Sequence, residues 1–279
     1  RSPSRGLGDV YKRQMKDYVK GVIVEITTAP QYSHIRLLKE CSKTEHYDII
    51  ENISSQLQEM SIERVRDGFH LRGHGDNYAV QVTPSQIEIS CIPSLYQSIL
   101  SMVEDAESIF GVPLNGFKIM QLGYKVSLLT NYKEVQPALE KLACPFTEEE
   151  SGYMEKLYRK GEPALFFATG YPNFFFRNSD KQLNMYASQS GFLKDTNFQL
   201  LTFELCLFRR FPIRIRNKHL VDFIGNENVF RQELTFQLYQ SYIELRKEAA
   251  VRLTTADDSS GFYSALDAEF KKINEQYGW

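Results

Sequence analysis

Hydrophobic and polar positions alternate over much of residues 65–130, which predicts antiparallel strands joined by tight turns. Phe69 and Leu71 alternate with His70 and Arg72, the period-two pattern of a half-buried strand. Two glycines and two Asx residues within positions 73–77 favour a hairpin loop. Apolar residues at every second position then indicate two more strands: Tyr78, Val80, Val82, Ile87, Ile89 and Cys91.

The end of this stretch predicts a helix followed by another strand. Ser94 with Gln97 three residues later has the arrangement of a capping box. Apolar residues at helical spacing then form one stripe: Leu95, Ile99, Met102, Val103, Ala106 and Ile109. Phe117, Ile119 and the run 126–129 indicate the next strand. A sheet covered on one face by this helix buries both apolar surfaces.

The N-terminal part of the chain has a less regular pattern. The β-branched residues of positions 21–28 predict a strand, whereas positions 34–38 fit either a short helix or a loop. Asp48, with Glu51 at its third position, predicts the start of a helix. The buried face of that helix is expected to comprise Ile49, Ile50, Ile53, Leu57 and Met60.

The second half of the chain is rich in strands and ends in two helices. Strands are predicted at 164–169, 173–177, 182–188 and 198–208, with a further short strand at 213–216. A long helix over 228–253 carries one apolar stripe: Phe230, Leu234, Leu238, Tyr242, Leu245 and Ala249. The terminal helix carries another: Phe262, Leu266, Phe270, Ile273 and Tyr277.

Together these elements predict an α+β fold with mostly antiparallel sheets covered by amphipathic helices. The order helix, strands, helix recurs, which indicates two pseudo-duplicated halves with long helices at the C-terminus. We expect an N-terminal α+β half at 15–145, a C-terminal α+β half at 146–253, and a hinge with the terminal helix at 254–279.

Residues 1–14 are set apart from this fold. Positions 4–14, Ser-Arg-Gly-Leu-Gly-Asp-Val-Tyr-Lys-Arg-Gln, resemble the in-frame translation of a transposon-type sequencing adapter. We interpret the segment as a non-native tail on a bacterial chain of metagenomic origin; a natural basic arm is the alternative. Under the first interpretation Met15 is either the native start or the point at which a longer gene was cut. Residues 1–14 contain four basic residues and one acidic residue. Without them the chain has 29 of its 33 basic residues and 34 of its 35 acidic residues. The remaining net charge of −5 argues against general affinity for nucleic acid.

The composition is 42% hydrophobic and 24% charged, which is typical of a soluble globular protein. No apolar run reaches the roughly 18 residues of a membrane span, so no membrane association is expected. The cysteines are far apart and include no Cys-x-x-Cys pair. We expect Cys91 and Cys206 to be buried thiols, and a reducing cytoplasm as the compartment.

One string of residues suggests metal or phosphoester chemistry: His70, His74 and Asp76. In a hairpin, however, four extended residues separate the two histidines by roughly 13 Å, which is too far to share one ion. We therefore predict a solvent-exposed turn there, and neither a metal site nor a cofactor. The sequence also has no nucleophile-elbow pattern and no phosphate-binding glycine loop.

The most distinct charge cluster is a basic run without an acidic residue: Arg209, Arg210, Arg214, Arg216 and Lys218. Phenylalanines interleave with it, as in a strand that binds phosphate groups. The alternative, which we favour, is the solvated face of an edge strand, where charges discourage aggregation. Consecutive phenylalanines in the strands at 164–169 and 173–177 must point to both faces of a sheet. That sheet is then either covered on both sides or offers a surface to a partner.

A turn motif and a strand motif together resemble a sporadically distributed bacterial family of unknown activity. The turn is Thr83-Pro84-Ser85, and the strand after the following helix is Ile119-Met120-Gln121-Leu122-Gly123-Tyr124-Lys125-Val126. The family has an Arg-x-Gly-Leu-Arg-Tyr strand, so Gln121 and Lys125 stand where the family has arginines. The resemblance implies an α+β fold and no known activity.

A second resemblance concerns the C-terminal half. Leu183-Asn184-Met185-Tyr186, then the segment ending in Glu204, then His219-Leu220-Val221-Asp222-Phe223 are similar in order to phage and plasmid replication initiators. The resemblance implies Tyr186 as a nucleophile and Glu204 as a supporting acid. Ala187 and Ser188 stand where that family has Asp and Lys, and the chain has no His-x-His pair for the metal of nicking enzymes.

We therefore expect a cytoplasmic binding or assembly module without catalytic residues, in a setting of mobile elements or defence. Its partner is expected to be another protein or a second copy of the chain, with nucleic acid bound through Arg209 to Lys218 as the alternative. The alternative function is DNA processing of the replication-initiator kind. A histidine converging with Tyr186 and Glu204 in a deep cleft would contradict the first interpretation.

Overall fold

The computed structural model describes residues 24–54, 59–66, 68–74, 78–91, 99–110, 116–133, 135, 144–146, 164–168, 173–177, 181–188, 193, 196–207, 219–252 and 261–279. Over these residues the chain has the α+β fold that the sequence predicts. None of the helices in this part is both long and apolar enough to cross a membrane. The tail at 1–14, the strand at 213–216 and the hinge at 254–260 lie outside the described residues.

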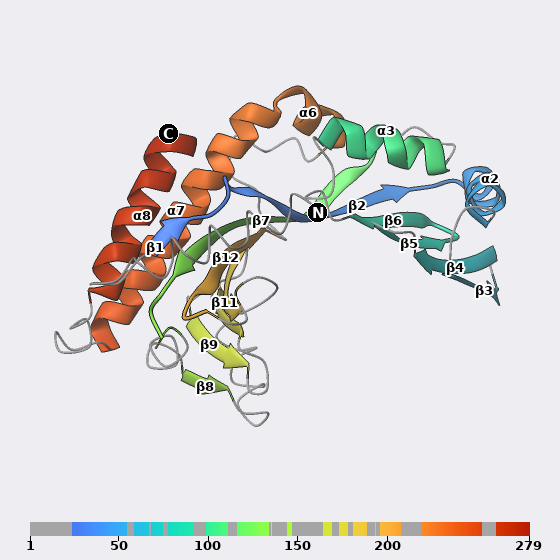
Figure 1. Ribbon diagram of the computed structural model, residues 1–279. Coiled ribbons are helices and arrows are strands. Elements are labelled where there is room, and N and C mark those ends of the chain that lie inside the picture. Colours follow the sequence, from blue (N-terminus) through green and yellow to red (C-terminus); the bar gives the residue numbers. More distant parts are fainter. Residues whose placement is uncertain are drawn as a thin grey trace, which may run out of the picture.

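Within the described ranges, twelve strands form one sheet, in the order β3-β4-β5-β6-β2-β7-β12-β11-β10-β9-β8, with β1 paired to β7 (Figure 1). Neighbouring strands are antiparallel, except that β8 runs parallel to β9. The bounds are β1 Val24–Ile26, β2 Gln31–Glu40, β3 Glu59–Val65, β4 Gly68–His74, β5 Tyr78–Thr83, β6 Gln86–Cys91, β7 Lys118–Thr130, β8 Cys144–Phe146, β9 Ala164–Ala168, β10 Asn173–Arg177, β11 Lys181–Ser188 and β12 Gln199–Leu207.

The long strand β7 joins the two predicted halves into this one sheet. One edge of β7 pairs with β1 and β2, and the other pairs with β12 from Gln199↔Thr130 to Leu207↔Leu122. A meander of strands lies on either side, β3 to β6 from the N-terminal half and β9 to β12 from the C-terminal half. The expectation of separate sheets is thus wrong, because both edges of β7 are occupied by strands from different halves.

Five helices lie along one face of the sheet, which we call the helix-covered face (Figure 1). They are α2 Lys43–Ser54, α3 Ile99–Phe110, α6 Leu220–Gly225, α7 Glu227–Arg252 and α8 Phe262–Tyr277. The pair α2 and α3 belongs to the N-terminal meander, whereas α7 packs against β7, β11 and β12 and against α8. The predicted long helix at 228–253 and the terminal helix are confirmed by α7 and α8.

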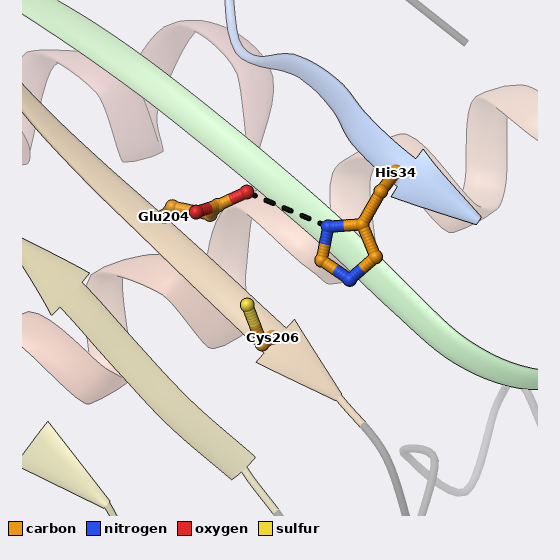
Figure 2. Close-up of side chains that lie close together, drawn as sticks. All are labelled: His34, Glu204 and Cys206. Carbon is orange, nitrogen blue, oxygen red and sulfur yellow. Dashed lines mark ion pairs between the residues drawn. The ribbon is translucent and has the colours of Figure 1, made fainter. Parts of the chain in front are cut away.

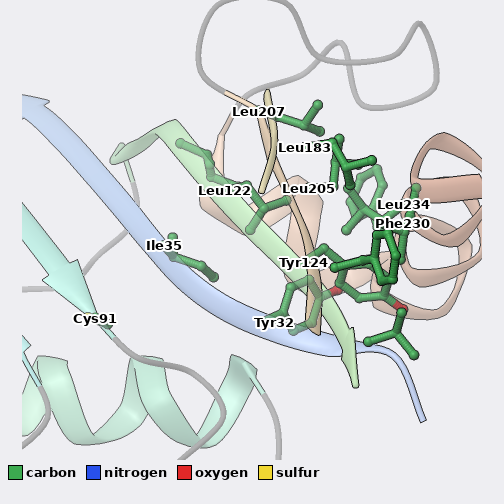
Figure 3. Packing of buried hydrophobic residues seen from close by; sticks show 14 of the residues in the cluster. Tyr32, Ile35, Cys91, Leu122, Tyr124, Leu183, Leu205, Leu207, Phe230 and Leu234 are labelled. Carbon is green, nitrogen blue, oxygen red and sulfur yellow. The ribbon is translucent and has the colours of Figure 1, made fainter. Parts of the chain in front are cut away.

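The core lies between the helix-covered face and the helices, as Figure 3 shows for β7, β12 and α7. Along β7 every second residue from Leu122 to Thr130 is buried, which is the alternation of a strand with one apolar face. Tyr124 packs edge-on against Tyr32 of β2, with ring centroids 5.4 Å apart. Its hydroxyl lies 3.2 Å from Thr235 Oγ1 on α7, so the buried phenol is hydrogen-bonded.

Strand β2 corrects the interpretation of positions 34–38 as a helix or loop. The register shifts between Tyr32 and His34, so Ser33 is an extra residue in a β-bulge. Because of that bulge, the buried residues Tyr32 and Ile35 are three positions apart. Three-residue spacing is the mark of a helix, and the strand pattern in the sequence is lost at this point.

Helix α2 begins six residues earlier than predicted. Its capping box is formed by Ser42 and Glu45, because the Ser42 amide donates to Glu45 Oε2 at 2.9 Å and the Glu45 amide donates to Ser42 Oγ at 3.3 Å. Asp48 therefore lies inside the helix. Met60, which the helical pattern included, belongs to strand β3, a strand that the sequence did not predict.

Candidate metal centre

The side of the sheet opposite the helices is polar where β7, β12 and β11 lie together. Side chains alternate along a strand, so residues between the buried ones point to this second face, which we call the polar face. Three rows of paired residues cross it, β7 first, then β12, then β11: Ser127–Thr202–Tyr186, Lys125–Glu204–Asn184 and Gly123–Cys206–Gln182. Functional groups from three strands thus lie side by side.

The bulge in β2 extends the third row by one histidine. His34 pairs with Gly123, and Ser33 lies beside it as the extra residue. A Cβ at position 123 would lie 2.2 Å from both His34 Nδ1 and Ser33 Oγ, which no real Cβ tolerates. A glycine at this point of β7 therefore lets the imidazole lie directly against the strand.

His34, Glu204 and Cys206 converge across β7 (Figure 2). His34 Nδ1 is 3.5 Å from Glu204 Oε1, and one ring nitrogen of His34, one carboxylate oxygen of Glu204 and Cys206 Sγ all lie within 4.8 Å of one another. Their side chains are partly or fully buried. An imidazole nitrogen, a carboxylate oxygen and a sulfur at this separation form a donor set that zinc uses in proteins.

Neighbouring amides hold two of these groups in place. Asn184 Nδ2 is 3.3 Å from Glu204 Oε2 and 3.4 Å from Cys206 Sγ, and donates to both. Gln182 Nε2 donates in turn to Asn184 Oδ1, which fixes the orientation of that amide. On the other side Ser33 Oγ lies 3.3 Å from His34 Nδ1. The cluster thus has its own shell of polar neighbours, as metal ligands in proteins do.

The charge states of the cluster follow from burial and hydrogen bonding. Burial alone would raise the pKa of Glu204, but hydrogen bonds with His34, Ser33 and Asn184 outweigh it and lower that pKa to about 2. Burial raises the pKa of the Cys206 thiol to about 12, and the Glu204 charge acts in the same direction. At neutral pH the cluster therefore holds a carboxylate beside a protonated thiol.

Tyr186 lies on the same face, one row away from Glu204. Burial raises the pKa of its phenol to about 12, with a further contribution from the Glu204 charge. The two residues of the alternative function are therefore close neighbours in the fold, and a histidine lies beside one of them. The structure brings His34, Glu204 and Cys206 together on a face of the described sheet, and the sequence analysis did not predict this group.

Some of the other residues singled out in the sequence lie within the described part of the structure, and others lie outside it. His70 and His74 both lie on β4, opposite Glu63 and Glu59, so His74 ends the strand and is not part of the predicted turn. Cys91 and Cys206 are buried free thiols, which confirms that prediction. The basic residues lie outside the described residues: Arg209, Arg210, Arg214, Arg216 and Lys218.

Sequence reasoning missed His34 because the bulge hid its strand. One signal was present, since Gly123 is an isolated glycine within an apolar strand pattern, and such a glycine indicates a bulge or a close approach.

Comparison with known proteins adds no assignment. Neither a scan against protein-family models nor a search of curated proteins finds a match.

Proposed function

We propose that this protein is a cytoplasmic, bacterial binding or assembly module without catalytic activity of its own. The observation that carries the proposal is the charge state of the polar face. The pKa values of Tyr186 and Cys206 are raised to about 12, so neither is a ready nucleophile near neutral pH. The pKa of Glu204 is lowered to about 2, whereas a general acid needs a pKa near the working pH.

The partner that we propose is a second copy of the chain, added at the edge strand β3. In the described part of the sheet, β3 pairs on one side only, with β4. Its free edge offers peptide N–H and C=O groups to another strand. Ile62, which pairs with the fully buried Leu71 and so points to the helix-covered face, is itself 44% exposed. A strand added beside β3 would cover this side chain and pair the open peptide groups.

Self-association of the purified full chain tests this proposal. Sedimentation velocity over a wide concentration range is expected to show a monomer–dimer equilibrium, and Ile62→Lys is expected to weaken it by about tenfold or more because a charge would be buried. Val221→Lys is the matched control, since Val221 on α6 is an exposed apolar residue of similar kind, 54% exposed, far from β3 in sequence. A chain that stays monomeric at all concentrations, or a dimer indifferent to Ile62→Lys, would overturn the proposal.

The alternative is a DNA-processing protein of the replication-initiator kind, and one observation favours it. Tyr186 and Glu204 lie on adjacent rows of one sheet face, and His34 lies beside Glu204. In this alternative a divalent ion and the Tyr186 phenolate would cleave single-stranded DNA. Strand nicking that Tyr186→Phe abolishes, with salt-sensitive DNA binding that Arg214→Glu and Arg216→Glu weaken, would replace the first proposal. Absence of both activities would leave the binding module.

A further inference from the structure

We propose that His34, Glu204 and Cys206 bind one divalent zinc-class ion on the polar face of the sheet. The proposal concerns the isolated chain and does not depend on self-association through β3. Its basis is the convergence of three different ligand types from two strands, β2 and β12, across the bare backbone of Gly123 on β7. The ion would then tie strands of the two halves together.

The separations fit a zinc site. Zinc lies about 2.0–2.3 Å from nitrogen, oxygen and sulfur ligands in a tetrahedron, which places the ligand atoms roughly 3.3–3.6 Å apart. The distance from His34 Nδ1 to Glu204 Oε1 is 3.5 Å, and Cys206 Sγ lies within 4.8 Å of a ring nitrogen of His34 and of a carboxylate oxygen of Glu204. Any excess over the tetrahedral separation would be closed by movement of the Cys206 side chain when the ion binds. A solvent molecule completes the fourth position.

The protonation states also fit. His34 presents Nδ1 to Glu204, and in the structure without an ion the hydrogen of this contact lies on Nδ1, because a carboxylate can only accept. An ion bound to Nδ1 would need the other imidazole tautomer, with the hydrogen on Nε2. Cys206 enters the site as a thiol, and zinc displaces its proton to solvent as the Zn–S bond forms. The two charges of the ion are then balanced by one carboxylate and one thiolate.

The surrounding residues would stabilise the loaded site. Asn184 Nδ2 donates to Glu204 Oε2 and to Cys206 Sγ, and the bond to sulfur would strengthen once the thiolate forms, because its acceptor is then charged. Thiolate and imidazole ligands favour zinc over magnesium or calcium, which prefer sets made of oxygen alone.

Metal titration of the full chain tests the proposal. The chain, stripped with a chelator, is titrated with Zn²⁺ in competition with a chromophoric chelator, and with Co²⁺ as a spectroscopic reporter. One ion per chain is expected, with a thiolate-to-cobalt charge-transfer band. Cys206→Ser is expected to remove that band and to lower zinc affinity by about tenfold or more. Cys91→Ser is the matched control, because Cys91 is also a buried thiol in a strand but lies opposite Ile35 in the hydrophobic core, on the other face of the sheet from the cluster. Both signals should persist in this variant.

Two further variants keep the result decisive if Cys206→Ser does not fold. His34→Ala and Glu204→Gln should each lower zinc affinity by about tenfold while circular dichroism shows the fold intact. Absence of stoichiometric zinc, or binding that none of the three variants changes, would overturn the inference. Zinc binding by a strictly monomeric chain would refute the proposed self-association and leave this site standing, so the two failures are distinguishable.

Discussion

Phe203 and Glu204 are adjacent in β12, yet they belong to two regions of the molecule with opposite demands. Phe203 points to the helix-covered face, where its ring lies edge-on to Phe270 with centroids 4.8 Å apart. Glu204 points to the polar face, where His34 and Asn184 surround its carboxylate. Phe203 stabilises the fold because its ring is removed from water, and Glu204 does so because its partly buried charge is hydrogen-bonded.

The stability of the fold thus depends mainly on the helix-covered face, and its candidate chemistry lies on the polar face. Burial of aromatic surface stabilises in proportion to area and tolerates no loss of volume. A partly buried charge contributes only while its hydrogen bonds remain. Changes on the helix-covered face should therefore affect folding most, and changes on the polar face should affect ion binding and the pH dependence of stability.

The largest expected effect is on the helix-covered face. Phe270→Ala removes a fully buried ring that stacks on Tyr242 at 3.8 Å between centroids. We expect the free energy of unfolding to fall by about 3–5 kcal/mol, measured by urea denaturation, because the cavity adds to the lost transfer free energy. Zinc affinity of the molecules that remain folded should be unchanged. A fall in zinc affinity as large as that of Cys206→Ser would show that the two faces are not independent.

The second-largest effect is expected at Gly123, where the absence of a side chain lets the His34 imidazole lie against β7. Gly123→Ala places a methyl group where His34 and Ser33 already lie, so the imidazole must move. We expect a loss of about 1–3 kcal/mol in unfolding free energy and weaker zinc binding. Gly225→Ala is the control, since a Cβ at that end of α6 meets nothing within 4 Å. Equal effects at positions 123 and 225 would contradict the role of the glycine.

The smallest effect is a pH dependence carried by Glu204. Its folded pKa, about 2, lies below the ordinary value of 4.5, so its contribution is fully present above that value and is lost as pH falls towards 2. Glu204→Gln should lower unfolding free energy by about 1–2 kcal/mol at pH 7, since one acceptor oxygen remains, and by almost nothing near pH 2. Denaturation series across this range measure the difference.

Glu88→Gln provides the comparison for that series. Glu88, on β6, is a carboxylate paired with Arg36 on β2, but the Arg36 side chain is 48% exposed, so water screens the pair. Its replacement should change stability by less than about 1 kcal/mol at any pH. A Glu204 variant that behaves like the Glu88 variant would mean that the cluster holds its carboxylate no better than an exposed ion pair does.

Much of the fold was predictable because its signals are local. The alternation in β5 and β6 and the stripes of α7 and α8 each lie within one element, so period and burial agree. Errors arose where two local signals compete. Ser42 with Glu45 and Asp48 with Glu51 both match a capping box, and only contacts of the folded chain select the first.

The candidate site was not predictable in the same way. Glu204 entered the sequence analysis through a resemblance, and Cys206 only as a buried thiol, with nothing to connect either to His34. His34 lies about 170 positions before Glu204 and Cys206 in the chain. The three residues meet because β7 pairs with β2 on one edge and with β12 on the other. A one-residue slip of either register would send His34 or Glu204 to the opposite face.

The sequence by itself determined many of the strands and helices, with β2 and β3 as exceptions, and which of their faces is apolar, because these properties follow from the local hydrophobic period of the chain. Tertiary structure alone decided that the halves share one sheet, that an extra residue in β2 faces a glycine in β7, and that three ligand-type side chains meet there. Strand order and register depend on the packing of the whole sheet against its helices, and no local pattern specifies them.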